Sequence, residues 1–187
     1  MTDTGAESDV QTLYVYVTGA DGAGKTSLVA SLGNEDDFFI DEELAIEYRV
    51  YHVDIELDLC VLAPVDGMRF DPLLEIDPRD LLGYIVMVDS TDVPSWELTQ
   101  KMIGTCRGYA LLPIILAANK QDLPNAIQPD RVGTALGTDA MMRVLGSVAT
   151  QPASAREVFL QLLYAIEREM EELDNLIARI EDLLGGD

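Results

Sequence analysis

The sequence predicts an α/β fold, in which a mostly parallel sheet is flanked by helices. Runs of apolar, strand-forming residues alternate with helical segments along the chain, which is typical of a sheet covered on both faces. A glycine-rich loop directly follows the first of these runs and opens a helix. The chain has 187 residues, of which 48% are hydrophobic, and this suits one packed domain. We expect that domain at residues 11–168, between a polar acidic tail at residues 1–10 and a helical extension at residues 169–187.

Six segments rich in strand-forming residues are expected to build the sheet: residues 13–17, 45–53, 55–63, 84–88, 113–118 and 144–149. Helices are predicted over residues 25–32 and 95–104, with a weaker one over residues 131–136. Residues 34–43 are dominated by Asp and Glu and are expected to form an irregular, solvated loop.

The last segment predicts a long helix with one continuous apolar stripe. Ser154 and Glu157 match a capping box, in which both side chains bind exposed amides at a helix start. Apolar side chains then follow a 4-3 spacing along one face: Phe159, Leu163, Ile166, Met170, Leu173, Ile177, Ile180 and Leu184. Such a helix is roughly 45 Å long, and a compact domain buries about its first half. The part after Met170 is expected to pack on another chain; the alternative is that the whole stripe packs on its own sheet or frays.

Residues 19–26 fit the pattern G-x-x-x-x-G-K-[ST], a phosphate-binding loop between a strand and a helix. Its glycines let backbone N–H groups turn inward around phosphate oxygens, and the helix N-terminus adds positive potential. Lys25 is expected to reach the β- and γ-phosphates, and the Thr26 hydroxyl to bind Mg²⁺. The predicted phosphate-binding residues here are Asp21, Gly22, Ala23, Gly24, Lys25, Thr26 and Ser27. The alternative is an ordinary glycine-rich turn.

A second motif, Asn-Lys-Gln-Asp at residues 119–122, follows a predicted strand and so lies at its carboxyl end, where α/β sheets bind ligands. The Asp122 carboxylate can accept two hydrogen bonds from the edge of guanine, whereas adenine would leave it unpaired. The stem of Lys120 can cover the face of the base, and Asn119 can brace the loop. The alternative is a polar loop in which Asp122 only caps a turn.

With these two motifs the chain resembles a Ras-superfamily small GTPase. Residues 119–126, Asn-Lys-Gln-Asp-Leu-Pro-Asn-Ala, are written as in the Arf-like branch, and Val-Asp-Ser-Thr-Asp at residues 88–92 and Asp21 are similar to it. The pattern also resembles the prokaryotic MglA-like GTPases. The resemblance covers about residues 13–167. It implies a P-loop NTPase fold with a six-stranded sheet, a guanine nucleotide with Mg²⁺, and switching between GTP and GDP states. It further implies that Ala149 lies near guanine, and it adds a small roadblock-like regulator as a partner.

The chain departs from this family at both of its switch motifs. Ser31 is the only serine or threonine between Ser27 and Ser90, so the loop after the first helix lacks the threonine that senses Mg²⁺ and the γ-phosphate. A carboxylate such as Asp37 or Asp41 could bind Mg²⁺ there, but a solvated acidic loop is the preferred interpretation.

The second motif needs an aspartate and a catalytic glutamine. Aligning on Arg69 and Phe70 puts Ala63 at the aspartate and Gly67 at the glutamine, and the other frame puts Pro64 and Met68 there. Gly67 can still offer its N–H to a γ-phosphate, whereas Asp66 would approach the metal only if the loop were rebuilt.

No catalytic residue is therefore assigned, and two functions stay open. The first is a guanine-nucleotide switch with slow or impaired GTP hydrolysis. The second is a pseudo-GTPase that binds nucleotide for structural stability and assembles with partners through its C-terminal helix. Both expect protein partners at that helix and at the switch regions, and both allow a homo-oligomer.

The formal net charge of −22 excludes some classes of partner. Such a surface repels nucleic-acid phosphates and anionic lipid, so no nucleic-acid partner is expected. No apolar run is long enough to insert in a membrane. Two cysteines, Cys60 and Cys106, make a disulfide framework improbable and favour a reducing cytoplasm. The acidity itself has two explanations that the sequence leaves open, adaptation to high salt and a simple solvated surface.

Overall fold

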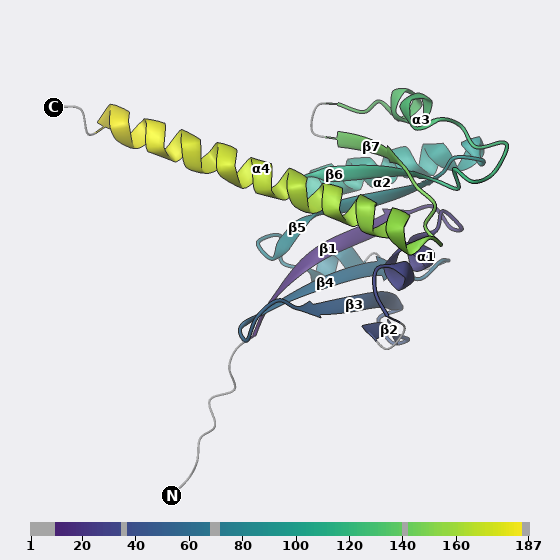
Figure 1. Ribbon diagram of the computed structural model, residues 1–187, viewed down its shortest axis with the longest axis horizontal. Coiled ribbons are helices and arrows are strands. Elements are labelled where there is room, and N and C mark those ends of the chain that lie inside the picture. Colours follow the sequence, from purple (N-terminus) through teal and green to yellow (C-terminus); the bar gives the residue numbers. More distant parts are fainter. Residues whose placement is uncertain (1–9, 35–36, 68–71, 140–141, 185–187) are drawn as a thin grey trace, which may run out of the picture.

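The computed structural model describes residues 10–34, 37–67, 72–139 and 142–184, with side chains described as far as residue 177. Its core is a seven-stranded sheet in the order β2-β3-β4-β1-β5-β6-β7 (Figure 1). The strands are β1 Gln11–Gly19, β2 Phe38–Asp41, β3 Ile46–His52, β4 Leu57–Pro64, β5 Leu81–Asp89, β6 Ile114–Asn119 and β7 Met142–Gly146. The helices are α1 Lys25–Ser31, α2 Trp96–Tyr109, α3 Pro129–Leu136 and α4 Pro152–Leu184, with short 3-10 turns η2 Pro72–Glu75 and η3 Val93–Ser95.

Five strands, β4-β1-β5-β6-β7, are parallel, and β3 and β2 continue the sheet as antiparallel strands at one edge. Successive side chains of a strand point to opposite faces, and each face is covered by helices. Val15 and Val17 of β1 pack with residues of α1 and α4, whereas Tyr16 packs with residues of α2 and α3. The predicted α/β class with a mostly parallel, helix-flanked sheet is therefore confirmed.

The sheet has one strand more than expected. Residues 34–43 were expected to be irregular, but β2 lies within them and pairs with β3. The acidic residues surround a short strand-forming core at Phe38, Phe39 and Ile40, and the ring of Phe39 stacks on Tyr48 across the pair with centroids 5.4 Å apart. Such cross-strand aromatic pairs stabilise a hairpin, which explains why local acidity did not prevent a strand.

The predicted capping box does not form, because α4 begins two residues before Ser154. Pro152 stands at the first helical position, where its fixed φ and missing N–H are tolerated. The Oγ of Ser154 instead accepts the N–H of Val148 at 2.9 Å, which ties the loop after β7 to the first turn of α4.

The face of α4 that contacts the sheet also differs from the predicted stripe. Ala155, Val158 and Leu162 are the buried residues, and Gly83 of β5 makes room for Leu162, since a Cβ there would lie 2.9 Å from Leu162 Cδ1. Of the stripe, Phe159 and Ile166 are only partly buried against the core. The predicted stripe thus runs beside the face of α4 that packs on the sheet. The helix comes closest to the sheet at Ala155 and opposite Gly83, where the side chains are small.

Beyond the domain, α4 projects away from the sheet (Figure 1). Met170, Leu173 and Ile177 are 62%, 57% and 45% exposed, so this later part of the stripe does not pack on its own sheet. Ile180 and Leu184 belong to the predicted stripe, but their side chains lie outside the described part. No helix in the described part of the chain has both the length and the apolarity needed to cross a membrane.

Candidate functional site

Four loops meet at the edge of the sheet where the parallel strands end, the edge at which α/β folds bind ligands. They follow β1, β4, β6 and β7. Between the first, third and fourth lies a cavity of about 250 Å³ lined by Gly22, Gly24, Ser27, Asn119, Lys120, Asp122, Leu123, Val148, Ala149 and Thr150. The structure therefore brings together the glycine-rich loop, the Asn-Lys-Gln-Asp motif and Ala149, which are far apart in the sequence.

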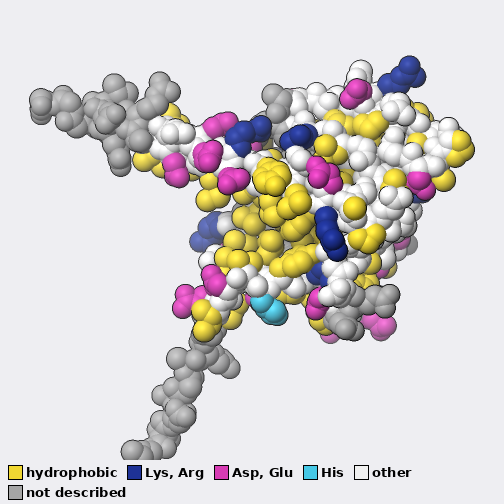
Figure 2. Space-filling view, viewed as in Figure 1, with side chains coloured by type: hydrophobic (Ala, Val, Ile, Leu, Met, Phe, Trp, Pro, Cys, Tyr) yellow, Lys and Arg dark blue, Asp and Glu magenta, His cyan; other side chains and the backbone are white. Residues whose placement is uncertain are grey.

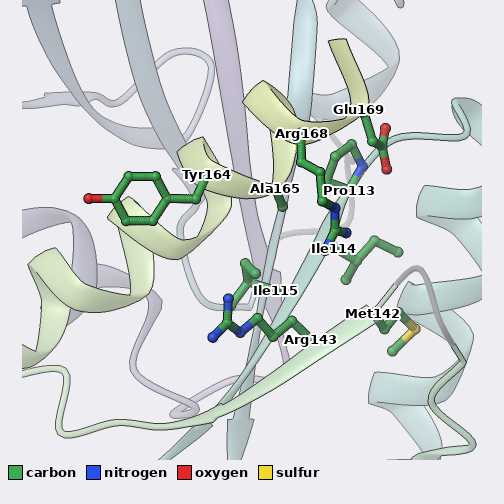
Figure 3. A pocket seen from close by; sticks show the side chains of 9 residues that line it. All are labelled: Pro113, Ile114, Ile115, Met142, Arg143, Tyr164, Ala165, Arg168 and Glu169. Atoms are coloured by element: carbon green, nitrogen blue, oxygen red, sulfur yellow. The ribbon is translucent and has the colours of Figure 1, made fainter. Parts of the chain in front are cut away.

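A different hollow of about 410 Å³ lies at the opposite edge of the sheet, beside α4 (Figure 3). It is lined by Ile114 and Met142, where β6 and β7 begin, and by Arg143 and Arg168. Arg168 already pairs with Glu172 at 3.8 Å, and the labelled side chains do not converge on one point. We therefore place the candidate site at the carboxyl edge of the strands.

At the end of the glycine-rich loop the backbone has a conformation that favours glycine. Gly24 caps α1 with a φ of 107°, in the left-handed region. A Cβ at this position would lie 2.2 Å from Nδ2 of Asn119, so any side chain would break the contact between the two motifs. The residue is required both by its conformation and by the closeness of its neighbour.

Lys25 is buried at the beginning of α1, with 3% of its side chain exposed. Its Nζ donates to the carbonyl oxygens of Gly19 at 3.1 Å and Ala20 at 3.4 Å, so the loop curls around the ammonium group. Lysine is buried only when it is paired, and here the pairing partner is Asp66. Thr26 follows at the surface and Ser27 is half-buried.

Asp66 contacts the glycine-rich loop, which the sequence analysis did not expect. Its Oδ1 forms a short ion pair with Lys25 Nζ, and its Oδ2 accepts the Gly22 N–H at 2.8 Å. Burial alone would raise the pKa of Asp66, but the hydrogen bonds from Lys25 and Gly22 outweigh it and hold that pKa below its ordinary value. An ionised carboxylate therefore occupies two of the donors, Lys25 Nζ and the Gly22 N–H, that the sequence predicted for phosphate oxygens.

The same two loops are joined by a second contact in the reverse direction. Gly67, which was expected to offer its N–H to a γ-phosphate, donates it to Oδ1 of Asp21 at 3.1 Å. Each loop thus gives one carboxylate to the other loop's backbone. Met68, Arg69, Phe70 and Asp71, which framed the sequence alignment of this loop, lie outside the described residues.

Asn119 connects three of the four loops. It is 4% exposed, and its Nδ2 donates to the carbonyl oxygen of Ala23 at 2.8 Å. Its Oδ1 accepts the N–H of Ala149 at 2.8 Å and the hydroxyl of Ser147 at 3.3 Å. The Ala149 N–H that the resemblance places near guanine is, in this arrangement, donated to Asn119.

Asp89, at the end of β5, holds the neighbouring Lys120, and sequence reasoning assigned Asp89 no role. Lys120 has a φ of 65°, and its Nζ lies 2.5 Å from Oδ2 of Asp89. The other oxygen, Oδ1, accepts the N–H and hydroxyl of Thr91 at 2.8 and 2.7 Å. Burial tends to raise the pKa of Asp89, but Lys120 and Thr91 hold it below its ordinary value. The signal for Asp89 was its place directly after a buried strand, in the quoted motif at residues 88–92.

Asp122 is exposed and stands in the lining of the cavity, close in sequence to the fixed Asn119 and Lys120. Gln121 also anchors this loop, since its Nε2 donates to Ser90 Oγ at 2.9 Å and to the carbonyl oxygen of Ile127 at 3.0 Å. The Asp122 carboxylate is thus presented to the cavity by a loop fixed on both sides.

The residues fit a nucleotide better than they fit a metal alone. The glycine cradle, buried Lys25 and the three-loop cavity match the phosphates and base of a nucleotide. Among the described residues, no group of three or more His, Cys, Asp or Glu side chains could hold a metal ion by itself. Mg²⁺ bound at Thr26 would therefore depend on phosphate oxygens for several of its ligands.

The acidic side chains that the sequence offered as other Mg²⁺ ligands have different partners. Asp37 lies 3.7 Å from Nη1 of Arg49. Asp41 Oδ1 accepts the N–H groups of Glu43 and Leu44, both at 2.9 Å, and so closes the turn between β2 and β3. Ala63 is buried in β4 and Pro64 ends that strand, so neither position supplies a carboxylate.

The seven-stranded sheet, the glycine-rich loop after β1 and the helices on both faces define the fold of a P-loop GTPase. Comparisons with protein-family models and with curated proteins find no match. Among solved structures, the chain is similar to the Arl6 BBS3 small GTPase from Trypanosoma brucei with the bound nucleotide analogue GppNp. The TM-score is 0.66 at 18% sequence identity, and the match covers 84% of this chain and 98% of that one. At this identity the likeness shows the fold.

Proposed function

We propose that this chain is a guanine-nucleotide-binding protein that alternates between GTP-bound and GDP-bound states, with Mg²⁺ as cofactor. The observation that carries the proposal is the Asn119 bridge, which joins the phosphate loop to the loop after β7 and leaves a cavity between them. Lys25 and the loop amides bind the phosphates, Thr26 binds Mg²⁺, and Asp122 reads the base. Bound Mg²⁺ would offset the negative charge of the phosphates.

Titration with fluorescent GDP, GTP and ATP tests the choice of base. We expect guanine nucleotides to bind at least about a hundredfold more tightly than ATP, because a site built to pair Asp122 rejects a base that cannot pair it. The variant Asp122→Ala should lose this preference, while Asp174→Ala, which removes an equal charge from α4, should keep it. Equal affinity of the native chain for ATP would contradict the proposal.

We further propose that intrinsic GTP hydrolysis is slow. Neither Ala63 nor Pro64 can position water or metal, and Asp66 is paired with Lys25. Mg²⁺-dependent phosphate release by the isolated protein should be close to the uncatalysed background. Rapid turnover without any added protein would show that this chain carries a catalytic group outside the residues named here.

The contact of Asp66 supports switching between two arrangements of the loop after β4. A phosphate group and the Asp66 carboxylate are both anionic and take the same donors, Lys25 Nζ and the Gly22 N–H. Phosphate binding therefore displaces Asp66 and frees Gly67 from Asp21. The loop has a nucleotide-dependent position through this competition, without the usual threonine and glutamine.

The exposed part of α4 favours a second function, a module for assembly. Figure 2 shows hydrophobic side chains gathered beside α4, with acidic side chains along its projecting part. On α4 itself, Leu163, Ile166 and Met170 form an open apolar surface, and the charged residues that line this surface are the acids Glu167, Glu171 and Asp174. Two copies of this helix would place acids against acids. This surface suits an amphipathic helix that carries Lys or Arg beside its apolar face.

A roadblock-like regulator that presents such a helix is one partner that could cover this surface. The pseudo-GTPase alternative requires only that some partner binds the C-terminal helix. Structures with GDP and with a GTP analogue separate the two functions. If residues 64–67 keep the same position in both, the switch loses to the assembly module. A chain that forms stable dimers at low salt would instead contradict the charge argument against self-association.

A further inference from the structure

Glu47 of β3 is a buried carboxylate that the proposed nucleotide site does not yet use. It stands directly opposite Ala63 of β4 in the antiparallel pair, so both side chains point to the same face of the sheet. Only 7% of Glu47 is exposed, and its Oε2 has no hydrogen-bond partner among the described residues. Burying a carboxylate oxygen without a partner destabilises the protein, and a bound cation would remove this destabilisation.

The neighbours of Glu47 place it near the beginning of α1. Arg49, two residues further along the same face, donates to the carbonyl oxygens of Val29 at 3.2 Å and Ala30 at 3.1 Å. Tyr51, two residues further again, donates to the carbonyl oxygen of Leu32 at 3.3 Å. Since β3 and α1 run in the same direction, as the contacts of Arg49 and Tyr51 show, Glu47 faces the turn of α1 that precedes Val29.

That turn carries Thr26, the predicted Mg²⁺ ligand. Thr26 precedes Val29 and Ala30 by three and four residues, and residues with this spacing share one face of a helix. The face of α1 that meets Arg49 therefore continues to Thr26 just where β3 continues to Glu47. Arg49 itself is committed elsewhere, since its Nε and Nη2 donate to α1 and its Nη1 lies 3.7 Å from Oδ2 of Asp37.

We infer that Glu47 is a carboxylate ligand, directly or through water, of the Mg²⁺ that accompanies the nucleotide. The inference rests on the proposed function. Mg²⁺ in nucleotide sites takes one or two carboxylates together with phosphate oxygens and water. Ala63 leaves the end of β4 without a carboxylate, and Glu47 supplies one from the adjacent strand at the paired position. Glu47 of β3 would thus do the work of the carboxylate that is missing from position 63 of β4.

The experiment measures how Mg²⁺ holds the nucleotide. The dissociation rate of fluorescent GDP is recorded in Mg²⁺ and again in excess EDTA, for the native chain, Glu47→Gln and the control Glu56→Gln, an exposed glutamate in the β3–β4 turn. We expect removal of Mg²⁺ to speed release by about tenfold or more in the native chain and the control. In Glu47→Gln this ratio should fall toward one, with the EDTA rate unchanged.

Thermal melting of the nucleotide-free proteins gives a second, independent measurement. Without its metal, a buried carboxylate lowers the stability of the folded protein. Glu47→Gln should therefore melt at the same or a higher temperature than the native chain. A lower melting temperature would show that Glu47 serves a structural ion pair, and an unchanged Mg²⁺ ratio would equally overturn the inference. If the native chain binds no guanine nucleotide at all, the proposed function fails instead.

Discussion

At the residue scale, the sequence predicted several of the side chains that gather at the candidate site, but not all of their contacts. Lys25, Asn119 and Asp122 were found because motifs fix their type and spacing. Asp66 was missed because it lies 41 residues from Lys25, and only the pairing of β4 beside β1 brings the two loops together. Glu47 was missed for a similar reason, since its interest comes from the residue opposite it on another strand.

Replacing Asp66 by Asn should strengthen nucleotide binding. The variant removes the negative charge that competes with phosphate at Lys25, so we expect GTP affinity to rise by about tenfold and GDP affinity by less. The measurement is the ratio of the two dissociation constants in the variant and in Asp58→Asn, which removes a charge from the far end of β4. A ratio unchanged from the native chain would show that Asp66 does not compete with the third phosphate.

The nucleotide-free Asp66→Asn protein should also be less stable, since buried Lys25 loses its charged partner. Its melting temperature is expected to fall and to recover when GDP is added in excess. The two effects have opposite signs, which separates loss of a competing carboxylate from general damage to the loop.

Cys60 offers a test of burial at a single residue. Burial in the sheet, with Asp58 adding to it, raises the pKa of Cys60 to about 12, so almost no thiolate exists at pH 8. Alkylation by iodoacetamide at pH 8 should therefore be slow in the native protein and fast after unfolding in urea. Mass spectrometry of the native protein showing prompt modification of Cys60 would contradict the described packing.

At the element scale, the 4-3 spacing predicted the existence and great length of α4, but not its packed face. The spacing shows which apolar residues share one face of the helix. Which face contacts the sheet depends on how closely the helix can approach, and here it approaches most closely at Ala155 and opposite Gly83. The same limit applies to β2, where composition suggested a loop and pairing with β3 made a strand.

Two alanine substitutions on α4 should separate its packed and projecting parts. Leu162→Ala removes a fully buried side chain and should lower the free energy of unfolding by roughly 2–5 kcal/mol. Leu173→Ala changes a side chain that is 57% exposed and should cost less than about 0.5 kcal/mol. Urea unfolding of the isolated protein measures both. A large loss for Leu173→Ala would show that the projecting part packs within the molecule or in a self-association.

At the scale of the whole molecule, alternation of strands and helices was enough to predict the layers of the sheet. The fold is shared with a structure at 18% identity, which shows how few of the residues are needed to specify it. What the pattern could not predict is how loops from four strands close on one another, because those contacts depend on the final positions of the strand ends.

The net charge of −22 should make stability depend on salt. Repulsion among acidic side chains opposes the compact state, and added ions screen it, so the melting temperature should rise between about 0.05 and 1 M KCl. Equal ionic strengths of KCl and NaCl should give similar curves if screening is the cause. A melting temperature indifferent to salt would remove adaptation to high salt as an explanation of the acidity.

The paired carboxylates of Asp21 and Asp66 have a consequence for the speed of binding. Asp66 occupies Lys25 and the Gly22 N–H while Asp21 holds Gly67 of the same loop, so under the proposed function a nucleotide reaches Lys25 only after the loop has opened. Entry then becomes a gated step: at high nucleotide concentration the observed association rate levels off at the rate of loop opening, and stopped-flow traces approach a ceiling. The strength of the contacts that Asp66 makes with Lys25 and Gly22 would thus set how quickly the protein responds to a change in nucleotide concentration.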